Sequence, residues 1–155
     1  NLIVPSIDCS DAACRSHTPY NSNQSTTSAA IASAEGGAVA VPGGPRDSLT
    51  VTFGTGEVTG VFARDRVCFG PHLCSQMGFV TATSESEEPF LQAPFDGVLG
   101  LGLPQLAEAQ EFSLMDSLVR GSRLRRNLFS VFFARGEEEG GQSEVLFGDM
   151  REERM

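Results

Sequence analysis

A short segment punctuated by glycine, Phe95 to Gly102, restricts the possible folds of this chain more than any other part of the sequence. It reads Phe-Asp-Gly-Val-Leu-Gly-Leu-Gly. The apolar pair Val98-Leu99 runs into Gly100, which predicts a buried strand that ends where another stretch of backbone comes very close. Glycine suits such a position because it has no Cβ atom to block the approach. The segment therefore predicts a strand in tight contact with a second part of the chain.

A second signal lies upstream, between Leu49 and Val61. β-Branched and apolar residues alternate along the chain on both sides of Gly54-Thr55-Gly56. Alternation around such a glycine pair is typical of a β-hairpin, and we expect its tip to be mobile. Seventeen glycines, eight prolines and the lack of a long apolar helical period also favour a β-rich fold with many turns. The length of 155 residues and the hydrophobic content of 40% suffice for one domain with a core.

One short helix is expected near Ser113. The run Ser113-Leu-Met-Asp116 resembles a capping box, with a shorter acid than the usual Glu. The residues that would form its apolar face are Leu114, Met115, Leu118 and Val119. Gly121 then ends the run, and arginines beyond it suit the negative pole of a helix. We interpret this segment as a structural surface helix.

Several segments, taken in order, resemble the amino-terminal lobe of the pepsin-like aspartic endopeptidases. Asn1 to Ser6 is similar to the Asn-Leu-Trp-Val-Pro-Ser that follows the family's first catalytic motif. Phe53 to Gly56 resembles the tip of the flap that covers the substrate, and Phe95 to Gly102 resembles the segment beneath the catalytic aspartate. Further similar segments are His17 to Ser22, Ser25 to Thr27, Phe129 to Phe133 and Val145 to Asp149, of which the last two resemble strands that close the lobe.

The resemblance implies a mostly β fold and a defined domain. Residues 1–155 would form one incomplete amino-terminal lobe of a two-lobed aspartic protease, with closed, barrel-like sheets, a flap hairpin and a short helix. Its partners would be a protein or peptide substrate and the carboxyl-terminal lobe of the same polypeptide. No cofactor is implied. The expected function is therefore that of a fragment of an aspartic endopeptidase.

The catalytic chemistry of this family needs two carboxylates close together. They share a proton and activate one water, because like charges at short range force their pKa values apart. In the resembling family the first aspartate would lie about five residues ahead of Asn1, and the second lies in the carboxyl-terminal lobe. No Asp-Thr-Gly or Asp-Ser-Gly triplet occurs in these 155 residues. We therefore assign no catalytic residue, expect residues 1–155 to be inactive alone, and interpret Asp96 as structural.

The resemblance also implies a substrate site. The flap backbone would hydrogen-bond an extended peptide as an added strand, and apolar residues would line the pocket for the side chain before the scissile bond. Phe90 enters this set through an alignment with a gap of one residue. An ordinary core role is the alternative for the apolar residues beyond the flap. The expected substrate-binding residues are Phe53, Gly54, Thr55, Gly56, Phe90, Phe95 and Val98.

Two departures from the family pattern concern the flap. Phe53 stands where the family usually has Tyr, and Ile3 stands where it usually has Trp. The hydroxyl and the indole nitrogen that could bond each other are both missing, so neither is left unpaired. We expect an apolar contact of Phe53 over Ile3. The same departures favour the alternative function, a catalytically inactive pepsin-like protein that serves as a binding or interaction module.

The cysteines leave two chemistries open. With His17 and His72 they offer enough nitrogen and sulfur ligands for zinc, and the alternative is two local disulfides. The resemblance supports one disulfide in the first pair, and the second pair flanks what looks like a turn between strand ends. We expect both disulfides and no metal, which implies an oxidising compartment such as the secretory pathway, a vacuole or lysosome, or the outside of the cell. The cysteines are Cys9, Cys14, Cys68 and Cys74.

Charge and hydropathy exclude other classes of partner. The net charge of −9 and the pI near 4.6 argue against nucleic acid, because phosphate binding needs clustered Lys and Arg. No run of 18 apolar residues is present to cross a membrane. Polar and glycine-rich composition predicts loops over residues 21–46 and 81–88, the first of them mobile, and a solvated hairpin turn at residues 137–141.

Overall fold

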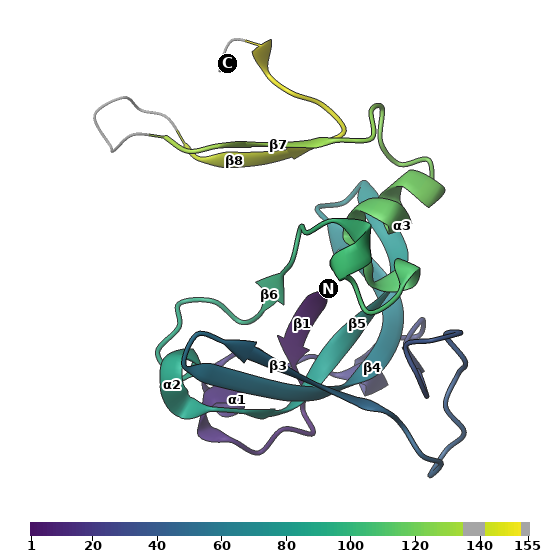
Figure 1. Ribbon diagram of the computed structural model, residues 1–155, viewed down its shortest axis with the longest axis vertical. Helices are drawn as coiled ribbons and strands as arrows, with labels where there is room; N and C mark the ends of the chain where they lie inside the picture. The colour runs from purple at the N-terminus through teal and green to yellow at the C-terminus, as the bar shows by residue number, and fades with distance from the viewer. Residues whose placement is uncertain (135–141, 153–155) are drawn as a thin grey trace.

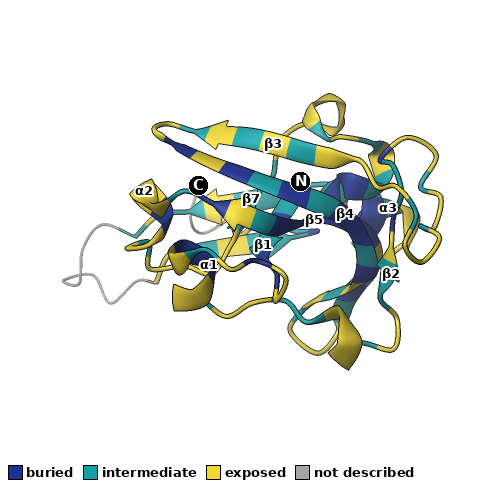
Figure 2. Ribbon diagram, turned by 90° about the horizontal axis from the view of Figure 1, so that it is seen from below, coloured by how far each residue is buried: buried dark blue, intermediate teal, exposed yellow. Residues whose placement is uncertain are grey.

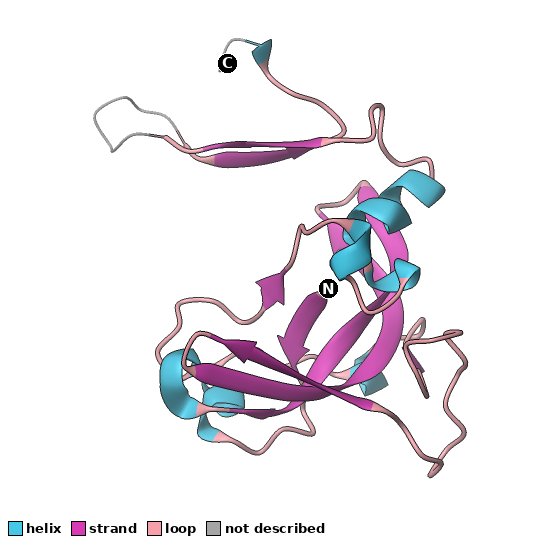
Figure 3. Ribbon diagram, viewed as in Figure 1, coloured by secondary structure: helices cyan, strands magenta, loops and turns pink. Residues whose placement is uncertain are grey.

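The computed structural model describes residues 1–134 and 142–152, and in this part strands predominate (Figures 1 and 3). The expected turn at residues 137–141 lies outside the described residues. The strands are β1 (Leu2–Pro5), β2 (Ala29–Ala30), β3 (Ser48–Phe53), β4 (Gly56–Phe69), β5 (Leu73–Glu85), β6 (Val98–Leu99), β7 (Phe129–Phe132) and β8 (Glu144–Phe147). The α-helices are α1 (Ala12–Ser16), α2 (Glu87–Phe90) and α3 (Leu114–Arg120), and three short 3-10 helices cover Ser22–Gln24, Pro104–Leu106 and Gln110–Phe112. The mostly β fold is confirmed.

The main sheet is open, which corrects the expectation of closed, barrel-like sheets. Its strand order is β2-β4-β5-β1-β6, with β3 also paired to β4. Closing a barrel requires the two edge strands to pair. Here β2 and β6 are the edges, each is two residues long, and they are hydrogen-bonded to β4 and β1 but not to each other. The long antiparallel pair of β4 and β5 forms the centre of the sheet, and β1 lies parallel to β5.

The predicted flap hairpin is confirmed. Strands β3 and β4 pair in antiparallel register from Ser48 opposite Val61 to Phe53 opposite Gly56. Gly54 and Thr55 therefore form a two-residue turn. Gly54 has φ +61°, a left-handed conformation that glycine adopts without steric cost, as short hairpin turns require.

The core lies along β4 and β5, where buried residues follow one another (Figure 2). Positions 77–82 of β5 are buried on both faces of the strand. Ile31 joins this core with no exposed surface, and its N–H donates to the Phe62 carbonyl at 3.0 Å. The interpretation of residues 21–46 as a mobile loop therefore misses β2 and Ile31, because one isoleucine in an Ala- and Ser-rich run gives no periodic signal. The expected loop at residues 81–88 is likewise wrong, since β5 continues to Glu85.

The predicted helix and the predicted close approach both occur. Ser113 caps α3 by accepting a hydrogen bond from the Asp116 N–H at 3.3 Å, and the helix ends at Gly121. At β6, the Gly100 N–H donates to the Asn1 carbonyl at 2.8 Å, and a Cβ atom on Gly100 would lie 3.0 Å from that oxygen. Val98 and Leu99 are only half-buried, however, because β6 is an edge strand.

Strands β7 and β8 form a separate two-stranded sheet (Figure 1). They pair with each other and, among the described residues, not with the main sheet, so they do not close the lobe as expected. Phe147 of β8 contacts Phe69 of β4, with ring centroids 5.6 Å apart. No helix in residues 1–134 and 142–152 is long and apolar enough to span a membrane.

Both expected disulfides are present. Cys9 bonds Cys14 at the start of α1, and Cys68 bonds Cys74 across the paired ends of β4 and β5. The Cα–Cα distances are 6.0 Å and 4.0 Å. A sulfur atom in a disulfide is not the thiolate that zinc requires, so the zinc alternative is wrong. Disulfides of this kind are consistent with a secretory route.

Candidate functional site

The tip of the flap rests directly on α2. Gly56 is buried, and a Cβ atom there would lie 2.7 Å from the Glu88 carbonyl oxygen and 2.8 Å from Phe90 Cε2. Phe53, across the hairpin turn from Gly56, meets the Phe90 ring edge to face with centroids 5.8 Å apart. The flap can thus pack closely on α2 because Gly56 has no side chain, and the contact between Phe53 and Phe90 stabilises this packing.

The expected apolar pocket residues lie around one small cavity beneath the flap. Phe53, Phe90, Phe95 and Val98 all line it, as does Ile3 of β1. Phe90 is buried, whereas Phe95 is 49% exposed. The free volume is only about 10 Å³, which is close to the space of one water molecule. The remaining expected residues, Gly54, Thr55 and Gly56, make the hairpin tip above the cavity and do not line it.

Phe53 makes an aromatic contact in addition to the apolar surroundings expected for it. Its aromatic partner is Phe90, and Ile3 lies in the same apolar cluster and lines the same cavity. The joint departure of Phe53 and Ile3 from the family pattern predicts that these two residues lie together and gives no indication of Phe90. The contact with Phe90 depends on how α2 folds after β5, which no local sequence pattern indicates.

Three ionisable side chains flank the apolar residues of the cavity, namely His17, Glu85 and Asp96. The two ring nitrogens of His17 face the carbonyl oxygens of Ala93 at 3.0 Å and Ala13 at 2.8 Å. These hydrogen bonds raise the pKa of His17, because only the protonated ring can donate to both. Burial raises the pKa of Glu85, against the smaller opposing effect of the positive charge on His17.

Two aspartates position the backbone around this cavity. Asp96 accepts a hydrogen bond from the Thr18 N–H at 2.9 Å, so its contact joins two loops, as the structural interpretation predicts. Asp11 accepts from the Ser84 hydroxyl at 2.8 Å and from the Glu85 N–H at 2.9 Å. These two bonds, the hydroxyl first, lower the pKa of Asp11. Neither carboxylate forms the close pair with a second aspartate that the family chemistry needs.

No local sequence signal marks His17 and Glu85 as residues of this site. From the sequence, His17 is a candidate zinc ligand and Glu85 lies in a predicted polar loop. They come together because α1 packs against the end of β5, and these segments are far apart in the sequence. A buried acid next to a histidine leaves no mark in local composition, so only the fold reveals the pair.

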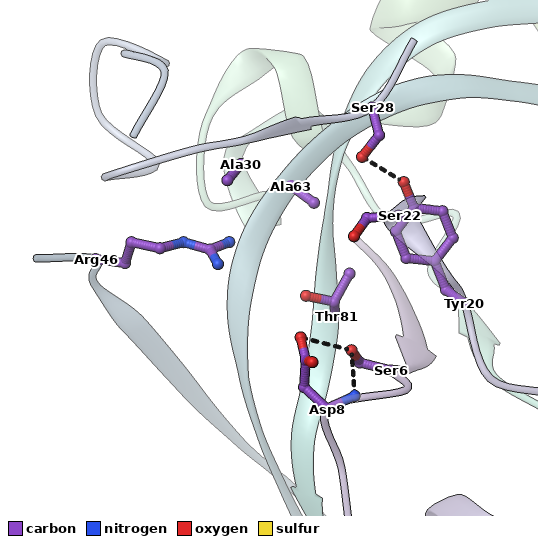
Figure 4. Close-up of a pocket in the computed structure, with 9 residues that line it drawn as sticks. All are labelled: Ser6, Asp8, Tyr20, Ser22, Ser28, Ala30, Arg46, Ala63 and Thr81. Carbon is purple, nitrogen blue, oxygen red and sulfur yellow. Dashed lines mark hydrogen bonds between the residues drawn. The ribbon is translucent and has the colours of Figure 1, made fainter. Parts of the chain in front are cut away.

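A larger hollow of about 210 Å³ lies on another part of the sheet (Figure 4). It is polar, and its side chains are already engaged. The Tyr20 hydroxyl lies 2.7 Å from both Ser28 and Asp65, and burial raises the pKa of Tyr20 to about 12. Arg46 donates to the carbonyl oxygens of Ile31 and Phe62. We interpret this hollow as structural, since most of its polar side chains are already hydrogen-bonded within the protein.

The sequence matches one protein family along its whole length. The family model described as eukaryotic aspartyl protease covers residues 1–155. The chain is 34% identical to embryonic pepsinogen of Gallus gallus over 152 residues, 33% to pepsin A of Bos taurus over 150, and 30% to cathepsin E of Oryctolagus cuniculus over 148. These matches cover 98%, 97% and 96% of this chain, but only 35%, 36% and 34% of the respective relatives. It thus spans about a third of their length, and it belongs to the eukaryotic aspartyl protease family.

Proposed function

We propose that residues 1–155 supply the flap and one wall of the substrate pocket of an aspartic endopeptidase. In this proposal the substrate is a protein or peptide, and both catalytic aspartates lie in other parts of the same polypeptide. The carboxyl-terminal lobe would contribute one of them. The compartment would be the secretory pathway, a lysosome or vacuole, or the outside of the cell, where disulfides persist.

The observation that carries this proposal is the gathering of apolar side chains under a hairpin with a glycine tip. Phe53, Phe90, Phe95 and Val98 come from the flap, the end of α2, the next loop and β6, yet they surround one cavity. An extended peptide would bond the backbone of the hairpin tip as an added strand, and an apolar side chain would enter below. Preference for hydrophobic residues next to the cut follows from this lining.

The pocket has to open before a side chain can enter. A free volume of about 10 Å³ is too small for an apolar side chain of a substrate. Phe95 is half exposed and the turn at Gly54-Thr55 is at the surface, so these are the parts that can move with the least loss of packing. Movement of Phe95 and the flap tip away from Phe90 would enlarge the cavity from above.

A catalytically inactive pepsin-like binding protein is the second candidate. The replacement of the usual Tyr and Trp by Phe53 and Ile3 favours it, together with the lack of a catalytic triplet in these residues. The coding sequence directly ahead of Asn1 distinguishes the two candidates. An Asp-Thr-Gly triplet there favours the enzyme, and a substituted aspartate favours the binding protein.

The pocket is tested by binding a peptide that carries a statine-type transition-state mimic and apolar side chains. We expect Phe95→Ala to raise the dissociation constant of the peptide about tenfold, as measured by calorimetry at pH 5, because an anchoring aromatic side chain is lost. Phe133→Ala removes a ring that is 80% exposed and outside the cavity, so it is the matched control. Equal affinity of the two variants would contradict the proposed pocket.

A further inference from the structure

Three arginines surround one hollow at the end of the main sheet that lies away from the flap. Arg66 belongs to β4, Arg120 is the last residue of α3, and Arg123 follows the helix. The hollow has a volume of about 430 Å³, and Ser75, Gln76 and Ser117 are among its other lining residues. Figure 1 shows α3 packed at one end of β4 and β5, with the flap and α2 at the other.

These arginines are not neutralised within the described part of the chain. All three are exposed, and the ion pairs found there involve Arg64, Arg125, Arg126 and Arg151 instead. None of the residues that line the hollow is a carboxylate. The whole chain has a net charge of −9, so a concentration of unpaired positive charge is unexpected and attracts anions to this point.

Hydrogen bonds fix the backbone at Arg66 and Arg123 and the side chain of Arg120. The Arg66 N–H donates to Asp65 Oδ1 at 2.7 Å, and the Arg123 N–H donates to the Leu118 carbonyl at 3.1 Å. The Arg120 guanidinium donates to the Ser117 hydroxyl at 3.2 Å. The Arg120 guanidinium therefore loses less conformational entropy on binding an anion than a free side chain would.

A purely structural role accounts for only part of this arrangement. Arg120 and Arg123 lie at the carboxyl end of α3, where positive charge stabilises the helix dipole. Arg66 lies on a strand, and the dipole gives no reason for its presence at the same hollow. Its strand partner is Gln76, which also lines the hollow and carries no charge.

We propose that this hollow binds an acidic segment of a peptide or protein, with its carboxylates paired to Arg66, Arg120 and Arg123. The planar guanidinium group matches a carboxylate through two parallel hydrogen bonds. The arginines come from β4, α3 and the loop after α3, and the hollow of about 430 Å³ is far larger than the roughly 10 to 15 Å³ that one water molecule needs. A chain bearing several carboxylates fits these dimensions better than one compact anion. The site is separate from the flap and does not depend on peptide hydrolysis.

The test is a direct binding measurement on the whole chain with both disulfides formed. The probe is a short peptide of alternating Glu and Gly with an uncharged fluorescent label, and anisotropy gives its dissociation constant at pH 7 and low salt. A peptide with Gln in place of each Glu is the control ligand, and inorganic phosphate is the competing compact anion.

Two triple variants separate the site from general charge effects. Arg66→Gln with Arg120→Gln and Arg123→Gln removes the three positive charges of the hollow. The matched control changes three arginines outside it, Arg15, Arg125 and Arg126, to Gln, and circular dichroism checks that both variants fold. We expect the first to weaken binding of the Glu peptide at least about tenfold and the second to change it less than about twofold.

Three results would overturn the proposal. Equal weakening by both triple variants would indicate general electrostatic attraction. Equal affinity for the Glu and Gln peptides would show that carboxylates are not recognised. A dissociation constant for phosphate as low as that for the Glu peptide would show that the hollow binds a compact anion instead.

Discussion

A Cβ atom at Gly56 would overlap the segment on which the flap rests, coming within 2.8 Å of Phe90 Cε2. We expect Gly56→Ala to lower the free energy of unfolding by about 1 to 3 kcal/mol, as overpacking of a filled site usually does. Urea denaturation measures the change. Thr55→Ala alters an exposed tip residue and is the control, with an expected change within about 0.5 kcal/mol. Indistinguishable stabilities would mean that the flap does not rest on α2 as described.

His17 gives the fold a dependence on pH. Its hydrogen bonds to Ala93 and Ala13 raise its pKa above the usual 6.5, so the protonated ring is favoured in the folded state. This contribution to stability is fully present below the unfolded value and is lost as the pH rises through the raised folded value. We therefore expect the stability difference between the natural chain and His17→Gln to be largest near pH 5 and to shrink as the pH rises above about 6.5.

The measurement is urea denaturation of both proteins at several pH values. His72→Gln, in the exposed turn between β4 and β5, is the matched control for loss of a histidine. A stability difference for His17→Gln that stays constant from pH 5 to 8, or grows, would refute the role assigned to its two hydrogen bonds.

Among the secondary-structure elements, α3 depends on a single capping side chain. The buried Ser113 hydroxyl accepts the Asp116 N–H, and its removal would leave that donor without the partner. We expect Ser113→Ala to lower the free energy of unfolding by about 1 kcal/mol. Ser113→Thr keeps the hydroxyl and should recover most of the loss in the same denaturation experiment. Equal stability of the alanine and threonine variants would contradict the capping role.

Local signals made some elements predictable from the sequence. The flap hairpin has alternation and a glycine turn, and α3 has a cap, an apolar face and a terminal glycine. The 21–46 segment has no such period, so the burial of Ile31 and the short strand β2 could not be foreseen. Their stabilisation comes from β4, which lies far along the chain.

At the scale of the whole molecule, the protein family is predictable from the sequence, whereas the way its strands and helices pack together is not. Ordered short motifs identify the pepsin-like lobe, whereas the open sheet depends on which strands pair at its edges. The cavity residues Phe53, Phe90, Phe95 and Val98 were placed together by family resemblance and are together in the structure. His17 and Glu85 join them only through the packing of α1 on β5. The separate β7–β8 sheet also depends on contacts that no local pattern encodes.

The central claim is that this chain provides the flap and pocket of an aspartic endopeptidase whose two catalytic aspartates lie outside residues 1–155. Cleavage of a fluorogenic apolar peptide from pH 3 to 7 tests it most directly. Residues 1–155 are compared with a longer polypeptide from the same coding sequence, with and without a statine-type mimic. We predict no cleavage by residues 1–155 and inhibitable cleavage by the longer polypeptide. Cleavage by residues 1–155 alone, or none by the longer polypeptide at any pH, would contradict the claim.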